Sequence, residues 1–131
     1  MTAPSTAPSL VREYEVRARS TDIFGRVMCS AREHHFIIDG PVQNGCPGEE
    51  VTPPEAFLAG VASCGVELLH VIARADGVPL GRVAATLTAT VDRGNQPRTD
   101  VTVFNSVRLD FRLTGTDAST AAALVEGFKR R

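Results

Sequence analysis

The sequence has few cysteines, no excess of positive charge and no long hydrophobic run. Its three cysteines, Cys29, Cys46 and Cys64, form no Cys-x-x-Cys pair, and their odd number does not suggest the disulfide framework of a small secreted protein. A formal net charge of -1 lacks the broad basic field that drives nucleic-acid binding. The most apolar run, 56–66, is only 11 residues long, too short to cross a bilayer. We therefore expect a soluble, cytoplasmic protein with no nucleic-acid or membrane partner.

Signals for cofactors and metals are also missing. No glycine-rich phosphate loop follows a predicted strand, so nucleotide cofactors are not indicated. His34 and His35 point to opposite faces of a strand, and His70 has Glu67 and Arg74 as helical neighbours. No spacing among these residues matches a pair of zinc ligands. We expect neither a metal nor any other cofactor.

Length and composition predict one packed domain. With 131 residues, 43% of them hydrophobic and 22% charged, the chain resembles an average globular protein and needs no disulfide or metal to hold its core. The first ten residues are rich in Ala, Pro, Ser and Thr and lack the basic and apolar regions of a signal peptide. We expect a flexible tail over 1–10 and a single domain over 11–131.

Three strands are expected before the first helix. Apolar and polar residues alternate over 13–18, and 22–29 is rich in large apolar residues, which together predict a hairpin. Residues 32–39 continue the alternation as a third strand, which a Gly-Pro pair ends. Three clusters of Gly or Pro over 41–54 disfavour a regular element and predict a loop.

A long central helix is predicted from Pro53 to about Ala75. Glu55 lies in its first turn, where the helix dipole favours an anion, and Gly77 follows as a stop. The first half is apolar or small on every side, so we expect it to be buried all round. We also expect an obligate homodimer, because one sheet's worth of strands is too little to cover such a helix.

Two further strands and a helix complete the chain. Alternating apolar residues over 83–92 and 101–113, separated by a polar segment with Gly and Pro, predict an antiparallel ribbon that wraps the central helix. Residues 117–131 carry an apolar stripe at helical spacing. The order βββαββα is α+β, since no strand–helix–strand alternation supports a parallel sheet.

Residues 53–64 read PPEAFLAGVASC, which is a Pro-x-Glu start, a run of small and apolar residues, and then a cysteine. Asp39-Gly40-Pro41 ends the strand before it. Both features, in this order, resemble the OsmC/Ohr family of osmotically inducible and organic hydroperoxide resistance proteins, in its OsmC-like subgroup. The resemblance extends from about Arg12 to the end. It implies antiparallel sheets wrapped around a long central helix in an intertwined homodimer.

The resemblance also implies a thiol-dependent peroxidase that acts in oxidative-stress defence. Cys64 would attack an organic hydroperoxide as a thiolate, and a dithiol reductant would restore it. An arginine from the N-terminal strands, oriented by Glu55, would stabilise the thiolate, and the two candidates are Arg26 and Arg32. Without the resemblance, Cys64 is interpreted as a structural residue, because free cysteines usually pack as small hydrophobic side chains.

Two details of this catalytic scheme stay open. Glu55 and Cys64 are nine residues apart, on opposite sides of one regular helix and about 13 Å apart along its axis. A shared arginine requires either a departure from helix at the prolines or a site across the dimer. Relatives carry a resolving cysteine near the end of the last helix. Here it would lie beyond Arg131, or the loop residue Cys46 would take its place.

Two other functions remain possible. One is a non-catalytic OsmC-like protein that binds a small hydrophobic molecule at its dimer interface. The other is a hot-dog-fold thioesterase that uses a helix carboxylate such as Glu55, although that fold usually places its helix after one strand rather than three. An accessible, reactive Cys64 separates the peroxidase from both alternatives.

Overall fold

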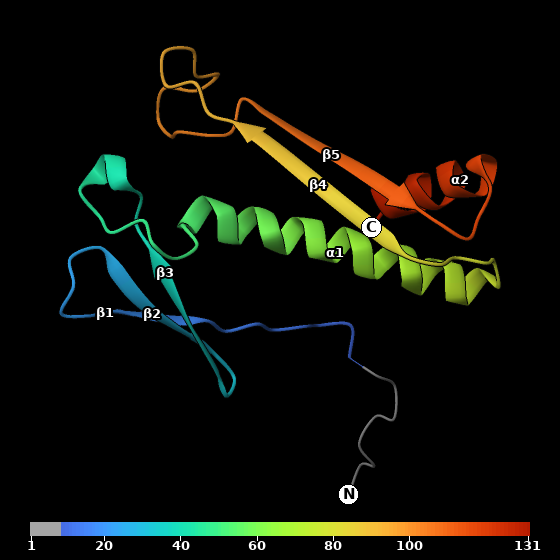
Figure 1. Ribbon diagram of the computed structural model, residues 1–131, viewed down its shortest axis with the longest axis horizontal. Coiled ribbons are helices and arrows are strands. Elements are labelled where there is room, and N and C mark those ends of the chain that lie inside the picture. Colours follow the sequence, from blue (N-terminus) through green and yellow to red (C-terminus); the bar gives the residue numbers. More distant parts are fainter. Residues whose placement is uncertain (1–8) are drawn as a thin grey trace, which may run out of the picture. The chain divides into compact units, whose positions relative to one another are not determined.

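The computed structural model describes residues 9–131, so most of the tail expected over 1–10 lies outside the described residues (Figure 1). The elements are β1 (Arg17–Ser20), β2 (Arg26–Ala31), β3 (His34–Asp39), the 3-10 helix η1 (Val42–Asn44), α1 (Pro53–Asp76), β4 (Val83–Thr90), β5 (Ser106–Leu113) and α2 (Ala118–Lys129). This order confirms the predicted α+β class. The chain divides into two compact units, Met1–Pro53 and Pro54–Arg131.

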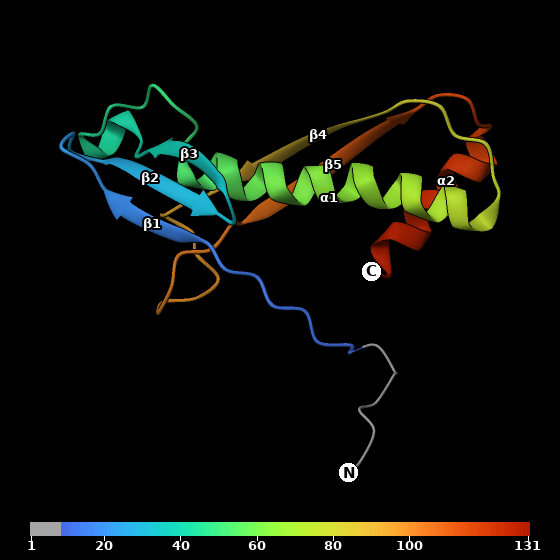
Figure 2. The same cartoon turned by 90° about the horizontal axis from the view of Figure 1, so that it is seen from below.

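The first unit contains an antiparallel sheet in the order β1-β2-β3 (Figure 2). Cys29 lies in the central strand, opposite Ala18 on one side and Phe36 on the other. The residue is only 5% exposed, as is common for a free cysteine that packs as a small hydrophobic side chain.

The strands of this sheet begin later than predicted. β1 pairs with β2 only from Arg17, which lies opposite Ser30, so the expected start at residue 13 was wrong. The expected strand over 22–29 begins instead at Arg26, because the preceding residues form a turn. The Arg26 backbone N–H donates to the Ile23 carbonyl at 3.1 Å, and Gly25 takes a left-handed φ of +80°, which a glycine adopts without steric cost.

Arg32 does not start a strand, contrary to the prediction. Ala31 pairs with His34, so Arg32 and Glu33 form a two-residue turn between β2 and β3. The φ of Arg32 is 54°, in the left-handed region that tight hairpins require. The third strand therefore begins at His34.

The segment between β3 and α1 is more regular than its Gly and Pro content predicted. The Pro41 carbonyl accepts hydrogen bonds from Asn44 N–H at 3.0 Å and Cys46 N–H at 3.3 Å, which closes η1. Gly45 ends η1 with a φ of 79°. The proline starts this turn because its fixed φ suits the first position, and the glycine supplies the left-handed exit.

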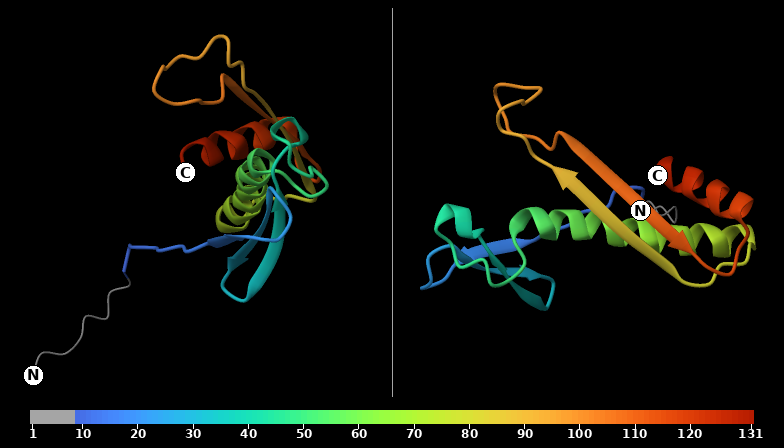
Figure 3. Two further views of the ribbon diagram at one scale, coloured as in Figure 1. Left: turned by 90° about the vertical axis from the view of Figure 1, so that its left-hand side faces the viewer. Right: turned by 45° about the horizontal axis from the view of Figure 1, so that its top comes forward.

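The second unit is built around α1 (Figure 3). Leu69, Ile72 and Ala73 from the second half of α1 form a buried cluster with Leu124 of α2. Partly buried hydrophobic residues pack around this cluster: Val78, Leu80, Val83, Phe111, Leu113, Val125 and Phe128. The core of this unit therefore lies along the second half of α1.

The first half of α1 is not buried all round, which corrects the prediction. The buried residues of α1 are Gly65, Leu69, Ile72 and Ala73, whereas Phe57 is 64% exposed. The sequence pattern shows that a face is apolar but not what covers it. By length and composition alone α1 could also cross a membrane, a test that the core helix of a soluble protein passes as well.

At Gly65 the Phe111 side chain of β5 lies directly against α1. A Cβ atom at Gly65 would lie 2.7 Å from Phe111 Cζ and 3.4 Å from Phe128 Cζ. The two phenylalanine rings meet edge to face, with centroids 5.6 Å apart. The absence of a side chain at Gly65 therefore allows this aromatic pair to pack against the helix.

β4 and β5 form the predicted antiparallel ribbon, but β5 starts at Ser106 rather than near residue 101. Residues 91–105 connect the strands and are ordered by side-chain amides. Asn105 Oδ1 accepts from the Asp92 backbone N–H at 2.7 Å and from Gln96 Nε2 at 3.0 Å. Gln96 Oε1 accepts from the Val103 N–H at 2.8 Å. Over 101–105, these side-chain hydrogen bonds take the place of the backbone hydrogen bonds of the strand that was expected.

Candidate site around Cys64

Cys64 lies near the middle of α1, and its thiol is free and exposed. The structure thus excludes the interpretation as a core residue within this chain. Phe57 lies seven residues earlier, two helical turns along the same face. Gly60 and Val61 lie between them on that face.

The thiol borders a hollow that is apolar. It is lined by Ala56, Phe57, Gly60, Val61, Cys64 and Phe128, and its volume is about 510 Å³. All but Phe128 belong to α1. None of the lining side chains carries a formal charge. We call this the apolar hollow, and its chemistry suits the organic part of a small molecule that reacts at sulfur.

Phe57, which lines the apolar hollow, also contacts the connection between β4 and β5. The Phe57 ring stacks on the ring of Phe104, with centroids 6.3 Å apart and an angle of 22° between the planes. Sequence patterns gave no indication of this contact, because Phe104 lies in a segment that was expected to be a strand.

Glu55 lies on the other side of α1. It lines a separate hollow with Leu58, Ala59, Ala62 and Leu87, none of which lines the apolar hollow at Cys64. α1 is helical from Pro53, so the prolines do not disrupt the helix between Glu55 and Cys64. Of the two routes by which these residues could share an arginine, a site across a dimer therefore remains.

Arg26 is bound to Asp39. Arg26 Nε and Nη2 donate to the two carboxylate oxygens at 2.7 and 2.8 Å, and Glu49 Oε1 lies 3.7 Å from Nη2. Asp39 is fully buried and also accepts the backbone N–H groups of Glu49 and Glu50, both at 3.0 Å. Four donors on one carboxylate tie β2, β3 and the following loop together.

These contacts shift both ionisation equilibria. The hydrogen bond from Arg26 holds the pKa of Asp39 well below its usual range, although burial acts in the opposite direction. The N–H groups of Glu50 and Glu49 lower it further. The same bond to Asp39 raises the pKa of Arg26. The positive charge of Arg26 is therefore largely matched by acidic partners.

The Arg26–Asp39 pair was missed from the sequence, although a signal for it existed. In an antiparallel hairpin, the position of the turn fixes every pair of opposite residues. A turn at Arg32-Glu33 places Arg26 opposite Asp39. Arg26 and Arg32 consequently lie at opposite ends of β2, with Arg32 exposed at the turn.

Cys46 is packed rather than free in its loop. It is partly buried, and a side chain on Gly25 or Gly40 would collide with its Sγ atom. The Gly40 N–H donates to the Gly25 carbonyl at 2.8 Å, which brings the two glycines together. Cys46 fills the space beside them.

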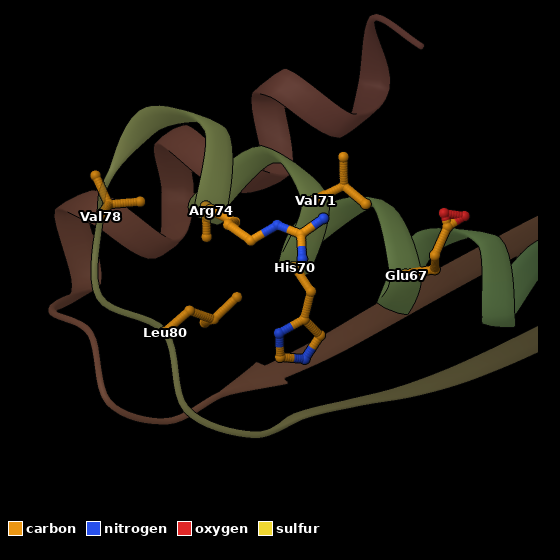
Figure 4. A pocket seen from close by; sticks show the side chains of 7 residues that line it. Glu67, His70, Val71, Arg74, Val78 and Leu80 are labelled. Atoms are coloured by element: carbon orange, nitrogen blue, oxygen red, sulfur yellow. The ribbon is translucent and has the colours of Figure 1, made fainter.

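A third hollow, in the second unit, has charged residues in its lining (Figure 4). Glu67, His70 and Arg74 of α1 line it together with Val78 and Leu80 from the segment that follows the helix, and its volume is about 420 Å³. Throughout residues 9–131, no group of three or more His, Cys, Asp or Glu side chains could hold a metal ion.

Comparison with known proteins places this geometry in context. The family model described as OsmC-like protein matches residues 46–131. Comparison with curated protein sequences finds no match. An OsmC-like protein from Mycoplasma pneumoniae has a TM-score of 0.78 at 13% identity, over 92% of this chain and 82% of that one.

Two organic hydroperoxide resistance proteins also share the fold. The Legionella pneumophila protein has a TM-score of 0.73 at 18% identity, over 93% of this chain and 85% of its own. The Elizabethkingia anophelis protein has a TM-score of 0.72 at 15% identity, over 94% and 85%. These likenesses confirm the predicted antiparallel sheets and central helix in the order βββαββα, which differs from the hot-dog order of one strand before the helix. In this shared fold α1 is the central helix.

Proposed function

Since the chain belongs to the OsmC-like protein family, we propose that it reduces organic hydroperoxides through Cys64. Proteins of this fold from Legionella and Elizabethkingia are named organic hydroperoxide resistance proteins. The proposal extends that activity to this chain as a cytoplasmic defence against oxidative stress.

The observation that carries the proposal is a free, exposed thiol at the edge of an apolar hollow. A peroxidatic cysteine must be accessible, because the thiolate attacks the peroxide oxygen directly. An organic hydroperoxide also needs an apolar surface for its carbon-containing group, and Phe57, Val61 and Phe128 supply one beside Cys64.

The proposed reaction has two steps. The Cys64 thiolate attacks the terminal oxygen of ROOH, the O–O bond breaks, and a proton completes the alcohol ROH while Cys64 becomes a sulfenic acid. A dithiol reductant then attacks the sulfenic sulfur, releases water and leaves as a disulfide, which returns Cys64 to the thiol.

We also propose that the working form is a homodimer. Phe57 and Val61 are exposed on the apolar first half of α1, and Glu55 lies on the opposite side of the helix from Cys64. A second copy would cover part of the apolar first half of α1 while leaving the apolar hollow open at Cys64, and it would bring its own Glu55 towards the thiol. In such a dimer Glu55 and Cys64 could share an arginine, which their positions on opposite sides of one helix prevent within a single chain.

The arginine that stabilises the thiolate is proposed to be Arg26 or Arg32. The charge of Arg26 is matched by Asp39 and Glu49, which favours a loop-holding role for Arg26. Alkylation of Cys64 across a pH series in Arg26→Ala and Arg32→Ala separates the two. The activating arginine is the one whose loss slows alkylation near neutral pH while the plateau at high pH is kept.

The central test is turnover of cumene hydroperoxide with a dithiol. Cys64→Ser should abolish turnover, whereas the conservative replacement Cys29→Ser should leave a folded, active enzyme. If the unmodified protein consumes no hydroperoxide while Cys64 remains reduced, the peroxidase proposal fails. Binding of a small apolar molecule in the apolar hollow would then be the function to test.

A further inference from the structure

We propose that Phe57 selects the organic group that reaches Cys64, and that Phe104 is the positioning residue that holds the Phe57 ring in place. The inference rests on the proposed function, because it concerns the substrate of the same thiol. The favoured substrates are hydroperoxides whose reacting group is attached to a flat or bulky apolar group.

The apolar hollow has the right extent for such a group. Phe57 and Cys64 lie on one face of α1, and seven residues of helix separate them by about 10 Å along the axis. Between them, a Cβ atom at Gly60 would meet no atom within 4 Å other than those of its chain neighbours and of the adjoining α1 backbone. The surface over Gly60 is therefore open, with the thiol at one end and an aromatic ring at the other.

Phe57 needs a neighbour to hold it in one position. Its side chain is 64% exposed, and an exposed side chain samples several rotamers unless a contact selects one. The ring of Phe104 supplies that contact by stacking on Phe57 at a centroid distance of 6.3 Å. Stacked aromatic pairs favour offset, nearly parallel rings of this kind.

Phe104 is itself fixed on both sides along the chain. The N–H of Val103 donates to Gln96 Oε1 at 2.8 Å, and the N–H of Asn105 donates to the Thr90 carbonyl at 2.8 Å. The Asn105 side chain adds a bond from its Nδ2 to the Asn95 carbonyl at 2.6 Å. This network connects the β4–β5 segment to the ring that borders the apolar hollow.

The test compares two alkylating probes at Cys64, N-phenylmaleimide and N-methylmaleimide, with the modified peptide identified by mass spectrometry. The ratio of their rates should exceed the ratio for glutathione. Phe104→Ala should lower this ratio about three- to tenfold, the effect expected of one aromatic stack. Phe104→Tyr retains a ring and should keep the ratio. Val101→Ala, an apolar truncation in the same connection, is the matched control.

Asn105→Ala provides a second route to the same result. It leaves both rings intact but removes the bonds that order the connection, so the ratio should fall as in Phe104→Ala. Circular dichroism checks that each variant is folded. If Phe104→Ala does not fold, the result for Asn105→Ala decides the outcome. The proposal is overturned if the unmodified protein has the same ratio of maleimide rates as glutathione. It is also overturned if the folded Phe104→Ala and Asn105→Ala variants keep the ratio of the unmodified protein.

Turnover distinguishes this inference from the function it rests on. Probe selectivity that depends on Phe104, without reduction of cumene hydroperoxide, supports the positioning role and refutes the peroxidase. Reduction of cumene hydroperoxide at the same kcat/KM in Phe104→Ala and the unmodified protein refutes the positioning role alone.

Discussion

Replacing Gly65 with alanine tests the packing of Phe111 against α1. The new methyl group would lie 2.7 Å from Phe111 Cζ and 3.1 Å from Phe111 Cε1. Phe111 cannot simply turn away, because its ring packs edge to face on Phe128 and against the buried cluster. Forcing an extra methyl group into a packed site costs about 1–3 kcal/mol.

A second effect acts in the opposite direction. Alanine is favoured over glycine within a helix by about 1 kcal/mol. Gly65→Ala should therefore lower the free energy of unfolding by roughly 0–2 kcal/mol, the packing cost less the helix gain. Because the two effects partly cancel, the sign of the change in the free energy of unfolding is a weak test. The change at Gly65 must therefore be compared with the changes caused by alanine at other glycines.

Gly60 and Gly127 are the matched controls. A Cβ atom at Gly60 meets nothing within 4 Å, and one at Gly127 makes an ordinary contact with Ile72 Cδ1 at 3.7 Å. Both alanine variants should gain about 1 kcal/mol from helix propensity. The gap between them and Gly65→Ala should therefore be about 1–3 kcal/mol.

Urea unfolding followed by circular dichroism measures these differences. All variants must be compared at one protein concentration, because a dimer gains apparent stability with concentration. Adding Phe111→Leu to Gly65→Ala should recover part of the loss by making room for the methyl group. If Gly65→Ala is as stabilising as Gly127→Ala, Phe111 does not pack at Gly65 and the described core is incorrect.

Asp39→Asn should destabilise the protein most near neutral pH. Because the pKa of Asp39 is lowered by folding, its carboxylate stabilises the fold above the usual aspartate value of about 4 and loses this effect as pH falls towards the lowered value. Urea midpoints of the variant and the unmodified protein should therefore converge in acid; a gap that is constant with pH would contradict this. Sedimentation should give a dimer at micromolar concentration, whereas a folded monomer would reject the site across two chains. After one equivalent of cumene hydroperoxide, peptide mapping should find Cys64 oxidised without a disulfide to Cys46, because Cys46 is packed beside Gly25 and Gly40. A Cys46–Cys64 disulfide would restore Cys46 as the resolving thiol.

The sequence was a good guide to the type and order of the elements. Apolar patterns predicted five strands, each of which overlaps one of the five strands in residues 9–131, and the proline start and glycine stop located α1 to within a residue or two. Strand ends were less accurate, because hydrogen-bonded pairing decides them. The left-handed φ of Arg32 shows this, since no residue preference favours a turn at an arginine.

The site was predictable only in part. The motif that ends at Cys64 selected the cysteine that proved to be exposed, whereas periodicity alone suggested a core residue. The aromatic stack of Phe57 and Phe104 could not be predicted, because it joins a helix to a distant connection through tertiary packing. The same limit hid the ion pair of Arg26 and Asp39 until the turn between β2 and β3 was located.

The pairing of strands with their neighbours in the chain has a consequence for synthesis on the ribosome. In the first unit, β1 pairs with β2 and β2 with β3, so this sheet needs nothing that is translated later. Domains generally fold as units in the order in which they emerge. The second unit differs, because α1 is made before Phe111 and Leu124, which cover its buried residues. The nascent helix that carries Cys64 therefore leaves the ribosome with its apolar surface uncovered until β5 and α2 have been made.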